Sequence, residues 1–352
     1  MKKTRINNLI MFFLKIIVAG SVAVGMLSLL NLALGYTGVH IDNKIGATDY
    51  VWESNQLRSN TSEGFAWLQV DEFGFNNTKE NTEKAMSNGV DILLMGSSHM
   101  EAMQASKDEN VGALLNAKLS KMNTYNIGMS GHDVYRIFDN VWDAVKVYQP
   151  EEYLVMEIDE IKLDIVEMQD VIDGKAKKIP SYDSGIIYHM QKIPAVKWVY
   201  QSIDNWVNQS KSAAGNVLDV FARENDDVDI SVYTDVLSDF LSLCVEACKQ
   251  TGCTPVVFYH QQADIQSDGA VKFETDKQYL NLFEETCKQN GIVFVDMSPI
   301  FAREYEENQV LPHGFINSYV GSGHVNAAGH RMIADKISEI ILELEEANNG
   351  TQ

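Results

Sequence analysis

The stretch DILLMGSSH, residues 91–99, gives the clearest indication of the fold. Its apolar run 92–95 predicts a strand buried on both faces, because a half-buried strand would alternate apolar and polar residues. Gly96 permits a tight turn directly after that strand. Ser98 is therefore expected at the carboxyl end of the strand, near the start of a helix.

Outward from this stretch, short apolar runs alternate with segments of helical spacing. Strands that are apolar throughout and separated by helices predict a parallel sheet covered on both faces, which is a three-layer α/β sandwich of the flavodoxin-like kind. In such sheets, functional groups gather at the carboxyl ends of the strands. We expect further strands at 125–128, 153–158, 255–260 and 292–296, and helices from the first turn to about 120 and at 134–147, 231–250, 277–290 and 326–346.

The predicted domain spans residues 91–346 and contains an insert at 160–230 that breaks the rhythm of strands and helices. The insert holds an aromatic cluster that includes Trp198 and Trp206. These rings are expected either in the core or facing a groove or a membrane surface.

The N-terminal region predicts a single membrane anchor. Residues 16–41 contain no Asp, Glu, Lys or Arg, and about 20 apolar residues suffice for a helix that crosses a bilayer. Basic residues precede this run, so the positive-inside rule predicts a cytoplasmic tail at 1–8, a transmembrane helix at 9–36 and everything later outside the cell membrane. A stem and N-terminal extension are expected at 37–90. The alternative is a cleaved signal peptide, whose apolar core of about 7–15 residues would be shorter than this run.

The charge distribution limits the classes of partner. The chain has a net charge of −21, and its first 35 residues contain four Lys or Arg and no Asp or Glu, so the remainder carries −25. Such acidity excludes a nucleic-acid partner, because phosphates repel it. The sequence has no P-loop, HExxH or dinucleotide-binding turn, so neither a cofactor nor a metal is predicted.

The four cysteines, Cys244, Cys248, Cys253 and Cys287, form no CxxC pair. They lack the spacing of a zinc site. Free thiols are expected, with a bridge between Cys253 and either Cys248 or Cys287 as the open alternative.

The second chemical element is GSGHVNAAGH, residues 321–330. His324 lies in a glycine-flanked loop before the last predicted helix, and Asn326 is a candidate N-cap. From there His324 can reach a serine at a neighbouring strand end, take its proton during attack on a carbonyl and return it to the leaving group. The alternative is that His324 only caps the helix.

Three blocks in order resemble the SGNH/GDSL hydrolase family: GSS at 96–98, NIGMSG at 126–131 and HVNAAGH at 324–330. The resemblance covers about residues 90–345. It implies Ser98 as the nucleophile and His324 as its base. It also implies an oxyanion hole that contains the N–H groups of Ser98 and Gly131.

This resemblance, together with the anchor, implies a membrane-anchored extracytoplasmic serine esterase or O-acyltransferase. The implied substrates are acyl esters, such as O-acetyl groups, of cell-envelope glycans, and a multispanning acyltransferase is an implied partner. One alternative is a catalytically degraded module that binds an envelope polysaccharide or a partner acyltransferase. Another is a lipase, because the sequence does not distinguish lipid esters from glycan esters.

The sequence departs from the family at the triad acid. The family places this acid three residues before the histidine, where this chain has Gly321, and no Asp or Glu lies between Glu307 and His324. We therefore expect a Ser98–His324 dyad, or a ring oriented by another acceptor such as a backbone carbonyl of residues 320–323.

The family's Gly-x-Asn-Asp block is also missing, and the third strand ends in MEIDE at 156–160. The asparagine that would complete the oxyanion hole is therefore not supplied there. His99, Asn126 and Asn317 are candidates to replace it. Glu157 and Asp159 are candidates either to orient a histidine or to cap a loop.

Overall fold

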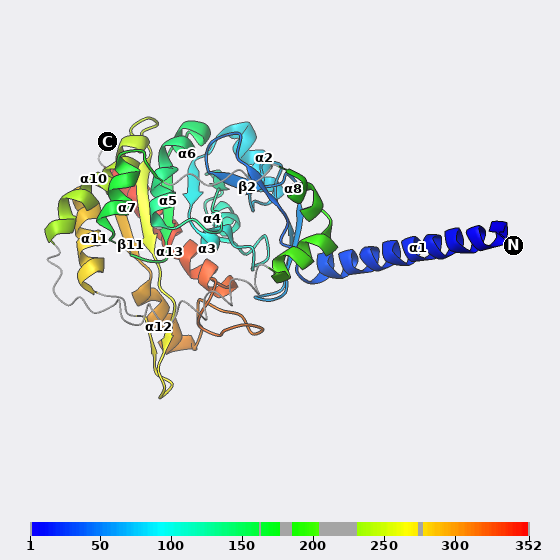
Figure 1. Cartoon of the computed structure of the whole chain (residues 1–352). Helices are drawn as coiled ribbons and strands as arrows, with labels where there is room; N and C mark the ends of the chain where they lie inside the picture. Colours follow the sequence, from blue (N-terminus) through cyan, green and yellow to red (C-terminus); the bar gives the residue numbers. More distant parts are fainter. Residues whose placement is uncertain (1, 162, 177–184, 204–230, 274–276, 351–352) are drawn as a thin grey trace.

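The centre of the domain is a five-stranded parallel sheet, seen in Figure 1. The computed structural model describes residues 2–161, 163–176, 185–203, 231–273 and 277–350. The strand order is β11-β8-β7-β5-β6, which is the flavodoxin-like order, and the predicted fold class is confirmed. The strands are β5 (Ile92–Met95), β6 (Thr124–Asn126), β7 (Tyr153–Ile158), β8 (Thr254–Tyr259) and β11 (Val293–Asp296).

Helices cover both faces of this sheet. Leu93 and Met95 belong to the apolar cluster on one face, whereas Ile92 and Leu94 belong to the cluster on the other. The run 92–95 is therefore buried on both sides, as predicted. The first face carries α5 (Val134–Asp139), α6 (Val141–Tyr148), α7 (Ile165–Ile172), α10 (Ser231–Cys248) and α11 (Lys277–Gln289), and the second carries α4 (Val111–Lys118), α12 (Ser298–Asn308) and α13 (Ala327–Gly350).

The stretch expected as a stem and extension, 37–90, packs into the domain. Val51, Leu68 and Phe75 lie in the same apolar cluster as Leu93. The Tyr125 hydroxyl of β6 donates to Asp71 Oδ2 at 2.7 Å. The stretch forms two antiparallel pairs and a helix: β1 (His40–Asp42) with β2 (Tyr50–Trp52), β3 (Leu57–Asn60) with β4 (Ala66–Gln69), and α2 (Lys79–Asn88).

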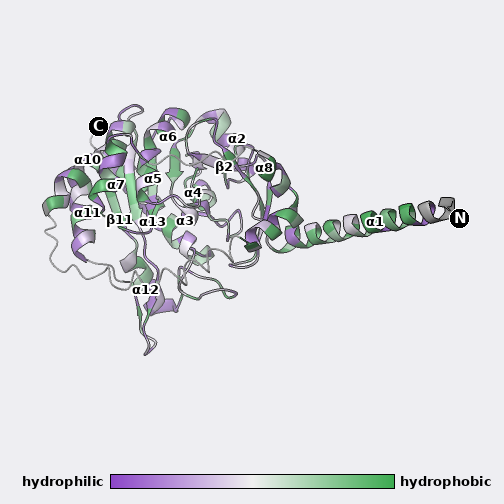
Figure 2. Ribbon diagram, viewed as in Figure 1, coloured by the Kyte–Doolittle hydropathy of each residue, from purple (hydrophilic) through white to green (hydrophobic). Residues whose placement is uncertain are grey.

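A long helix, α1 (Lys2–Leu34), precedes the domain. It projects away from the domain in Figure 1 and is apolar along most of its length in Figure 2. Residues Asn7–Leu34 are long and apolar enough to cross a membrane, and none of this segment's apolar window is buried in the protein. A signal sequence near an N-terminus meets the same criterion.

The remaining elements are short and border the site or the insert. They are α3 (Ser98–Glu101), α8 (Gly185–Gln191) and the hairpin of β9 (Asp264–Ile265) with β10 (Val271–Lys272). Trp206 of the insert lies outside the described residues. All four cysteines are free and buried, so neither alternative disulfide forms.

Candidate active site

Ser98 is the first residue of α3, directly after the turn that ends β5. A Cβ on Gly96 would lie 2.5 Å from Glu157 Oε2, so only glycine fits this turn. The N–H of Ser97 donates to the same Glu157 oxygen at 2.7 Å, and the Ser97 hydroxyl accepts from the His99 N–H at 3.2 Å. These bonds fix Ser98 at the point where the strand order of the sheet reverses, between β5 and β7.

His324 reaches Ser98 from the loop before α13. The Nε2 atom of His324 lies 3.0 Å from the Ser98 Oγ atom. Asn326 caps α13, because its Oδ1 accepts from the N–H groups of Ala328 and Gly329 at 3.0 and 3.1 Å. Its amide nitrogen donates to carbonyls of the same loop, so the loop that carries His324 is held on both sides. The sequence thus paired the two residues that the fold brings together.

Glu63 supplies the acid that the sequence did not locate. Its Oε2 lies 2.6 Å from Nδ1 of the His324 ring, and its Oε1 accepts from the His324 backbone N–H at 2.7 Å. The expected dyad, and the expected backbone carbonyl of 320–323, are therefore corrected. A carboxylate on Nδ1 fixes the proton there and leaves Nε2 free to accept from Ser98. The side chain of Glu63 is 20% exposed and that of His324 is 27% exposed.

The loop that carries Glu63 joins β3 to β4 and is clamped by Asn317. The Asn317 amide donates to the carbonyls of Thr61 and Gly64, both at 2.9 Å, and its oxygen accepts from the Gly64 N–H at 2.9 Å. All its described polar contacts go to this loop, so Asn317 holds the acid rather than the oxyanion. Asn60 adds bonds to the N–H groups of Ser62 and Glu63.

The loop after β6 carries the predicted oxyanion donor. Gly131 has a φ of +85°, which favours glycine. The N–H groups of Ser98 and Gly131 have no acceptor among the hydrogen bonds of the described chain, so their predicted role stays a prediction. Asn126 has both amide atoms engaged: Oδ1 accepts from Gly128 N–H at 2.8 Å and Nδ2 donates to the Met100 carbonyl at 2.7 Å. It ties this loop to α3 and is not free to bind an oxyanion.

The two strand-end carboxylates contact histidines other than His324. Glu157 Oε1 lies 2.9 Å from His260 Nε2, and Asp159 Oδ2 lies 3.3 Å from His99 Nε2. The other His99 nitrogen, Nδ1, accepts from the Val325 N–H at 3.2 Å. His99 is therefore held between two elements and does not replace the missing oxyanion donor.

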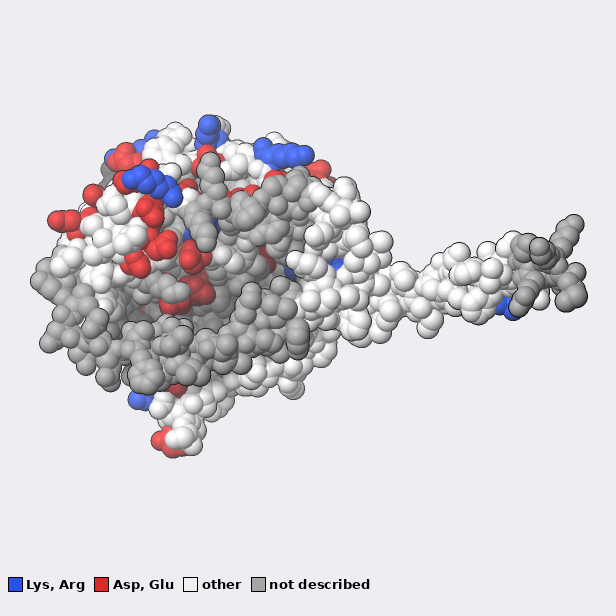
Figure 3. All heavy atoms as spheres, in the orientation of Figure 1, with Lys and Arg blue, Asp and Glu red and all other residues white. Residues whose placement is uncertain are grey.

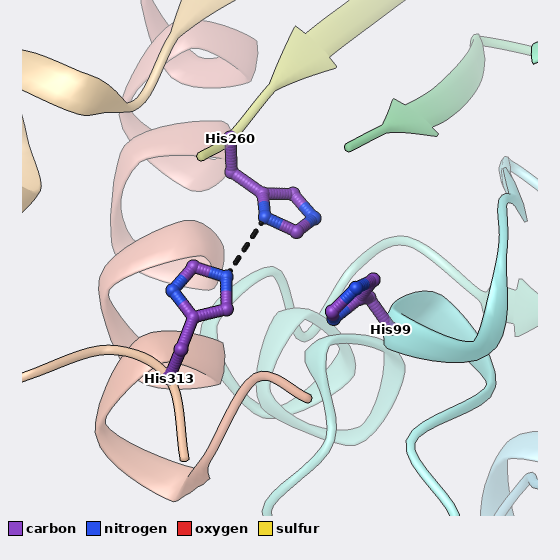
Figure 4. Close-up of side chains that lie close together, drawn as sticks. All are labelled: His99, His260 and His313. Carbon is purple, nitrogen blue, oxygen red and sulfur yellow. Dashed lines mark hydrogen bonds between the residues drawn. The ribbon is translucent and has the colours of Figure 1, made fainter. Parts of the chain in front are cut away.

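Three buried imidazoles, those of His99, His260 and His313, lie close together (Figure 4), with one nitrogen of each within 4.8 Å of the others. His260 Nδ1 lies 3.0 Å from His313 Nε2, which extends the bond to Glu157 into a chain of three groups. A metal ligand needs a lone pair directed at the ion, and both nitrogens of His99 and of His260 are already taken by partners. The cluster therefore fits a hydrogen-bonded network, and the residues do not fit a metal site.

Burial lowers the pKa of two further histidines beside the site, His313 and His330. It lowers the pKa of His313, and the neighbouring His260 and His99 lower it further. His330 is buried beside this network, and burial lowers its pKa to about 3. The rings of His313 and His330 are therefore neutral at pH 7, whereas, against the effect of its burial, the hydrogen bond to Asp159 raises the pKa of His99.

No protein-family model matches this sequence. No curated protein is significantly similar to it in sequence. Solved structures with a similar fold include an acetyl xylan esterase, with 12% identity and a TM-score of 0.40 over 71% of this chain and 98% of that one. A member of the lipolytic protein G-D-S-L family from Veillonella parvula has 13% identity and a TM-score of 0.38, over 71% and 96% of the two chains. A psychrotrophic esterase from Pseudoalteromonas sp. has 11% identity and a TM-score of 0.37, over 72% and 98%.

The sheet order and the approach of His324 to Ser98 agree with the resemblance to SGNH/GDSL hydrolases that the three sequence blocks carry. The carboxylate that contacts the His324 ring comes from the N-terminal extension and not from the position three residues before the histidine, where the resemblance implies an acid.

Proposed function

We propose that the protein is a serine acyl-ester hydrolase or acyltransferase with Ser98, His324 and Glu63 as its triad. The observation that carries this proposal is the continuous chain of hydrogen bonds from Ser98 through His324 to Glu63, 3.0 and 2.6 Å long. A non-catalytic binding module has no need of a carboxylate, an imidazole and a hydroxyl aligned in this order.

The geometry supports a two-step reaction. Ser98 Oγ attacks the acyl carbonyl while its proton passes to His324 Nε2, and the C–O bond to the alcohol breaks as His324 returns that proton to the leaving oxygen. Water or an acceptor hydroxyl then attacks the acyl-Ser98 ester, again giving its proton to His324, and Ser98 leaves with that proton. The N–H groups of Ser98 and Gly131 are the proposed donors to the oxyanion.

We also propose that α1 anchors the protein in the cell membrane and that the domain lies on its outer side. Helix α1 is long and apolar enough to act as an anchor, and the basic residues before it favour a cytoplasmic N-terminus. We propose acyl esters of cell-envelope glycans as substrates and a multispanning acyltransferase as a partner. We expect the full chain to stay in the membrane fraction after alkaline extraction. We also expect protease added to intact cells to cleave its C-terminal domain. Release by alkali would contradict the anchor.

Labelling with a fluorophosphonate probe tests the nucleophile. The full chain should label, Ser98→Ala should not, and Ser87→Ala, on the exposed face of α2, should label like the wild type. Equal labelling of all three proteins would remove Ser98 as the nucleophile. No labelling of the wild type would favour the degraded binding module.

A further inference from the structure

The hairpin that carries Glu63 is hydrogen-bonded to the C-terminal end of α1. The Trp67 indole N–H donates to the carbonyl of Ala33 at 2.9 Å, and the Thr61 hydroxyl donates to the carbonyl of Leu34. Glu63 lies between these two residues on the same hairpin. The catalytic acid is therefore held one short loop away from the last turn of the helix that can span a membrane.

The hairpin and the segments bonded to it or to α1 carry exposed apolar side chains. Most large hydrophobic side chains that are exposed outside α1, among the described residues, fall in three segments: 57–67, 186–203 and 316–320. The first is the hairpin of Glu63, and the third is the loop that Asn317 bonds to it. We call these side chains the apolar rim: Leu57, Phe65 and Trp67; Ile186, Ile187, Met190, Ile193, Trp198, Val199, Tyr200 and Ile203; Ile316, Tyr319 and Val320.

The middle segment of the rim packs directly on α1. The Asn31 side chain donates to the carbonyl of Pro194 at 2.6 Å, and the Ala195 N–H donates to the Ser28 hydroxyl at 3.3 Å. Trp198 lines a groove with four residues of α1 and with the glycine that follows the helix: Leu27, Leu30, Asn31, Leu34 and Gly35. The rim thus continues the apolar surface of α1 onto the domain.

The charge of the rim differs from that of the rest of the chain. The protein has 49 Asp and Glu residues, yet residues 185–203 and 315–323 contain none, and residues 57–69 contain only Glu63. That carboxylate is bonded to His324. In Figure 3 the surface around the base of α1 is mostly uncharged, whereas charged atoms gather on the part of the domain farther from α1.

We propose that the apolar rim rests on the outer surface of the bilayer that α1 spans, and that the site takes acyl esters carried by membrane-anchored molecules. This rests on the proposed function, because it names the substrate class of the same site. An apolar surface of this extent is unfavourable in water. Tryptophan and tyrosine are favoured at the headgroup level. A bilayer is the occupant that α1 itself brings to this surface.

The apolar rim lies only a few residues away from the proposed triad along the chain, and this limits which substrates reach Ser98. Ile316, Tyr319 and Val320 lie between His313 and His324 in one loop, and Phe65 lies two residues after Glu63. A rim seated among headgroups therefore holds Ser98 close to the membrane surface. An ester on a lipid, or on a glycan anchored by a lipid, reaches this position by diffusing within the membrane. A soluble polymer has to reach it from the surrounding water.

Site-directed labelling of the full chain tests the seating of the rim. The native cysteines are all buried, so a maleimide fluorophore can report on Val320→Cys, at an exposed rim position, and on Leu342→Cys, at an exposed position of α13. Leu342 is near Glu345, which bonds Tyr153 at the amino end of β7, the edge of the sheet opposite Ser98. In phosphatidylcholine vesicles with nitroxide-labelled headgroups, we expect several-fold stronger quenching at position 320 than at position 342. Equal quenching would overturn the seating.

Paired substrates test the substrate class. One is 4-nitrophenyl acetate in water, and the other is an acetylated diacylglycerol in the vesicles. We expect Val320→Asp to lower the ratio of vesicle-borne to soluble turnover about tenfold, with Leu342→Asp leaving the ratio unchanged. An unchanged ratio in Val320→Asp would overturn the inference. If the wild type hydrolyses neither ester and Ser98 is not labelled by the fluorophosphonate, the proposed function is refuted. The quenching experiment would still decide whether the rim rests on the bilayer.

Discussion

Glu63 contacts His324 through both carboxylate oxygens, one at the ring and one at the backbone N–H. The ring contact sets the tautomer that Ser98 requires, and the backbone contact aligns the carboxylate with the loop. Glutamate is long enough to make both bonds from the hairpin of β3 and β4.

Glu63→Gln keeps the shape of the side chain but removes its charge. We expect kcat/KM for a soluble ester to fall between about 10² and 10⁴-fold, because the amide stabilises neither the correct tautomer nor the imidazolium. Steady-state hydrolysis of 4-nitrophenyl acetate measures this. Glu72→Gln, at an exposed position in the same extension, is the matched control, and a Glu63→Gln enzyme as active as this control would remove Glu63 from the triad.

Gly321 occupies the position at which the family carries its acid, but the backbone there does not suit one. Its φ is +82°, and a Cβ would lie 2.9 Å from Ile265 Cδ1. We therefore expect Gly321→Asp to give no rescue when it is added to Glu63→Gln. The same hydrolysis assay applies, and a tenfold recovery of kcat/KM in the double variant would contradict the assignment of the acid to the hairpin.

At the scale of elements, the site is assembled from three segments that are distant in sequence. The turn after β5 carries Ser98, the loop before α13 carries His324, and the hairpin of β3 and β4 carries Glu63. Asn317 joins two of these segments through its three bonds to the Glu63 loop. We therefore expect Asn317 to act as a positioning residue whose effect passes through Glu63.

A double-mutant cycle tests this role. Asn317→Ala should lower kcat/KM about 10 to 100-fold in the wild type, but much less in a Glu63→Gln background, because the acid that it positions is already lost. Asn308→Ala, at an exposed position of α12, serves as the control. Equal losses in both backgrounds would mean that Asn317 acts on stability and not on the acid.

At the scale of the whole molecule, buried neutral histidines couple stability to pH. His330 is fully buried, neither of its ring nitrogens has a partner among the described residues, and burial lowers its pKa from 6.5 to about 3. Between these values the unfolded chain binds a proton that the folded chain does not. The buried neutral ring of His330 therefore makes its full contribution to the free energy of unfolding above pH 6.5, and this contribution is lost as the pH falls toward 3.

His330→Leu should reduce this dependence. We expect the free energy of unfolding of the wild type to fall by about 2 kcal/mol more than that of His330→Leu between about pH 6.5 and about pH 5. Urea unfolding of the full chain in detergent micelles, followed by tryptophan fluorescence, measures the difference. The exposed His189→Leu should leave the dependence as in the wild type, and identical slopes in all three proteins would contradict the role of His330.

The sequence alone determined the sheet and singled out two residues, Ser98 and His324, that the fold brings together. The run 92–95 is apolar at every position and the run 153–158 at every position except Glu157, and neither alternates apolar and polar residues, so this local pattern predicts burial on both faces. Ser98 and His324 were found because each is flanked by small residues at a predicted boundary between a loop and a helix. The long apolar helix α1 was also predictable from the sequence, because its length and hydropathy depend only on local composition.

Only the tertiary structure decided the third member. Glu63 and His324 are 261 positions apart, and no spacing or periodicity links them. The same holds for Asn317, which looked like a candidate oxyanion donor and is the clamp of the Glu63 loop, and for Glu157 and Asp159, which bind His260 and His99. Local patterns report which face of an element is buried, whereas the pairing of polar groups depends on how the hairpin of β3 and β4 folds back across the carboxyl edge of the sheet.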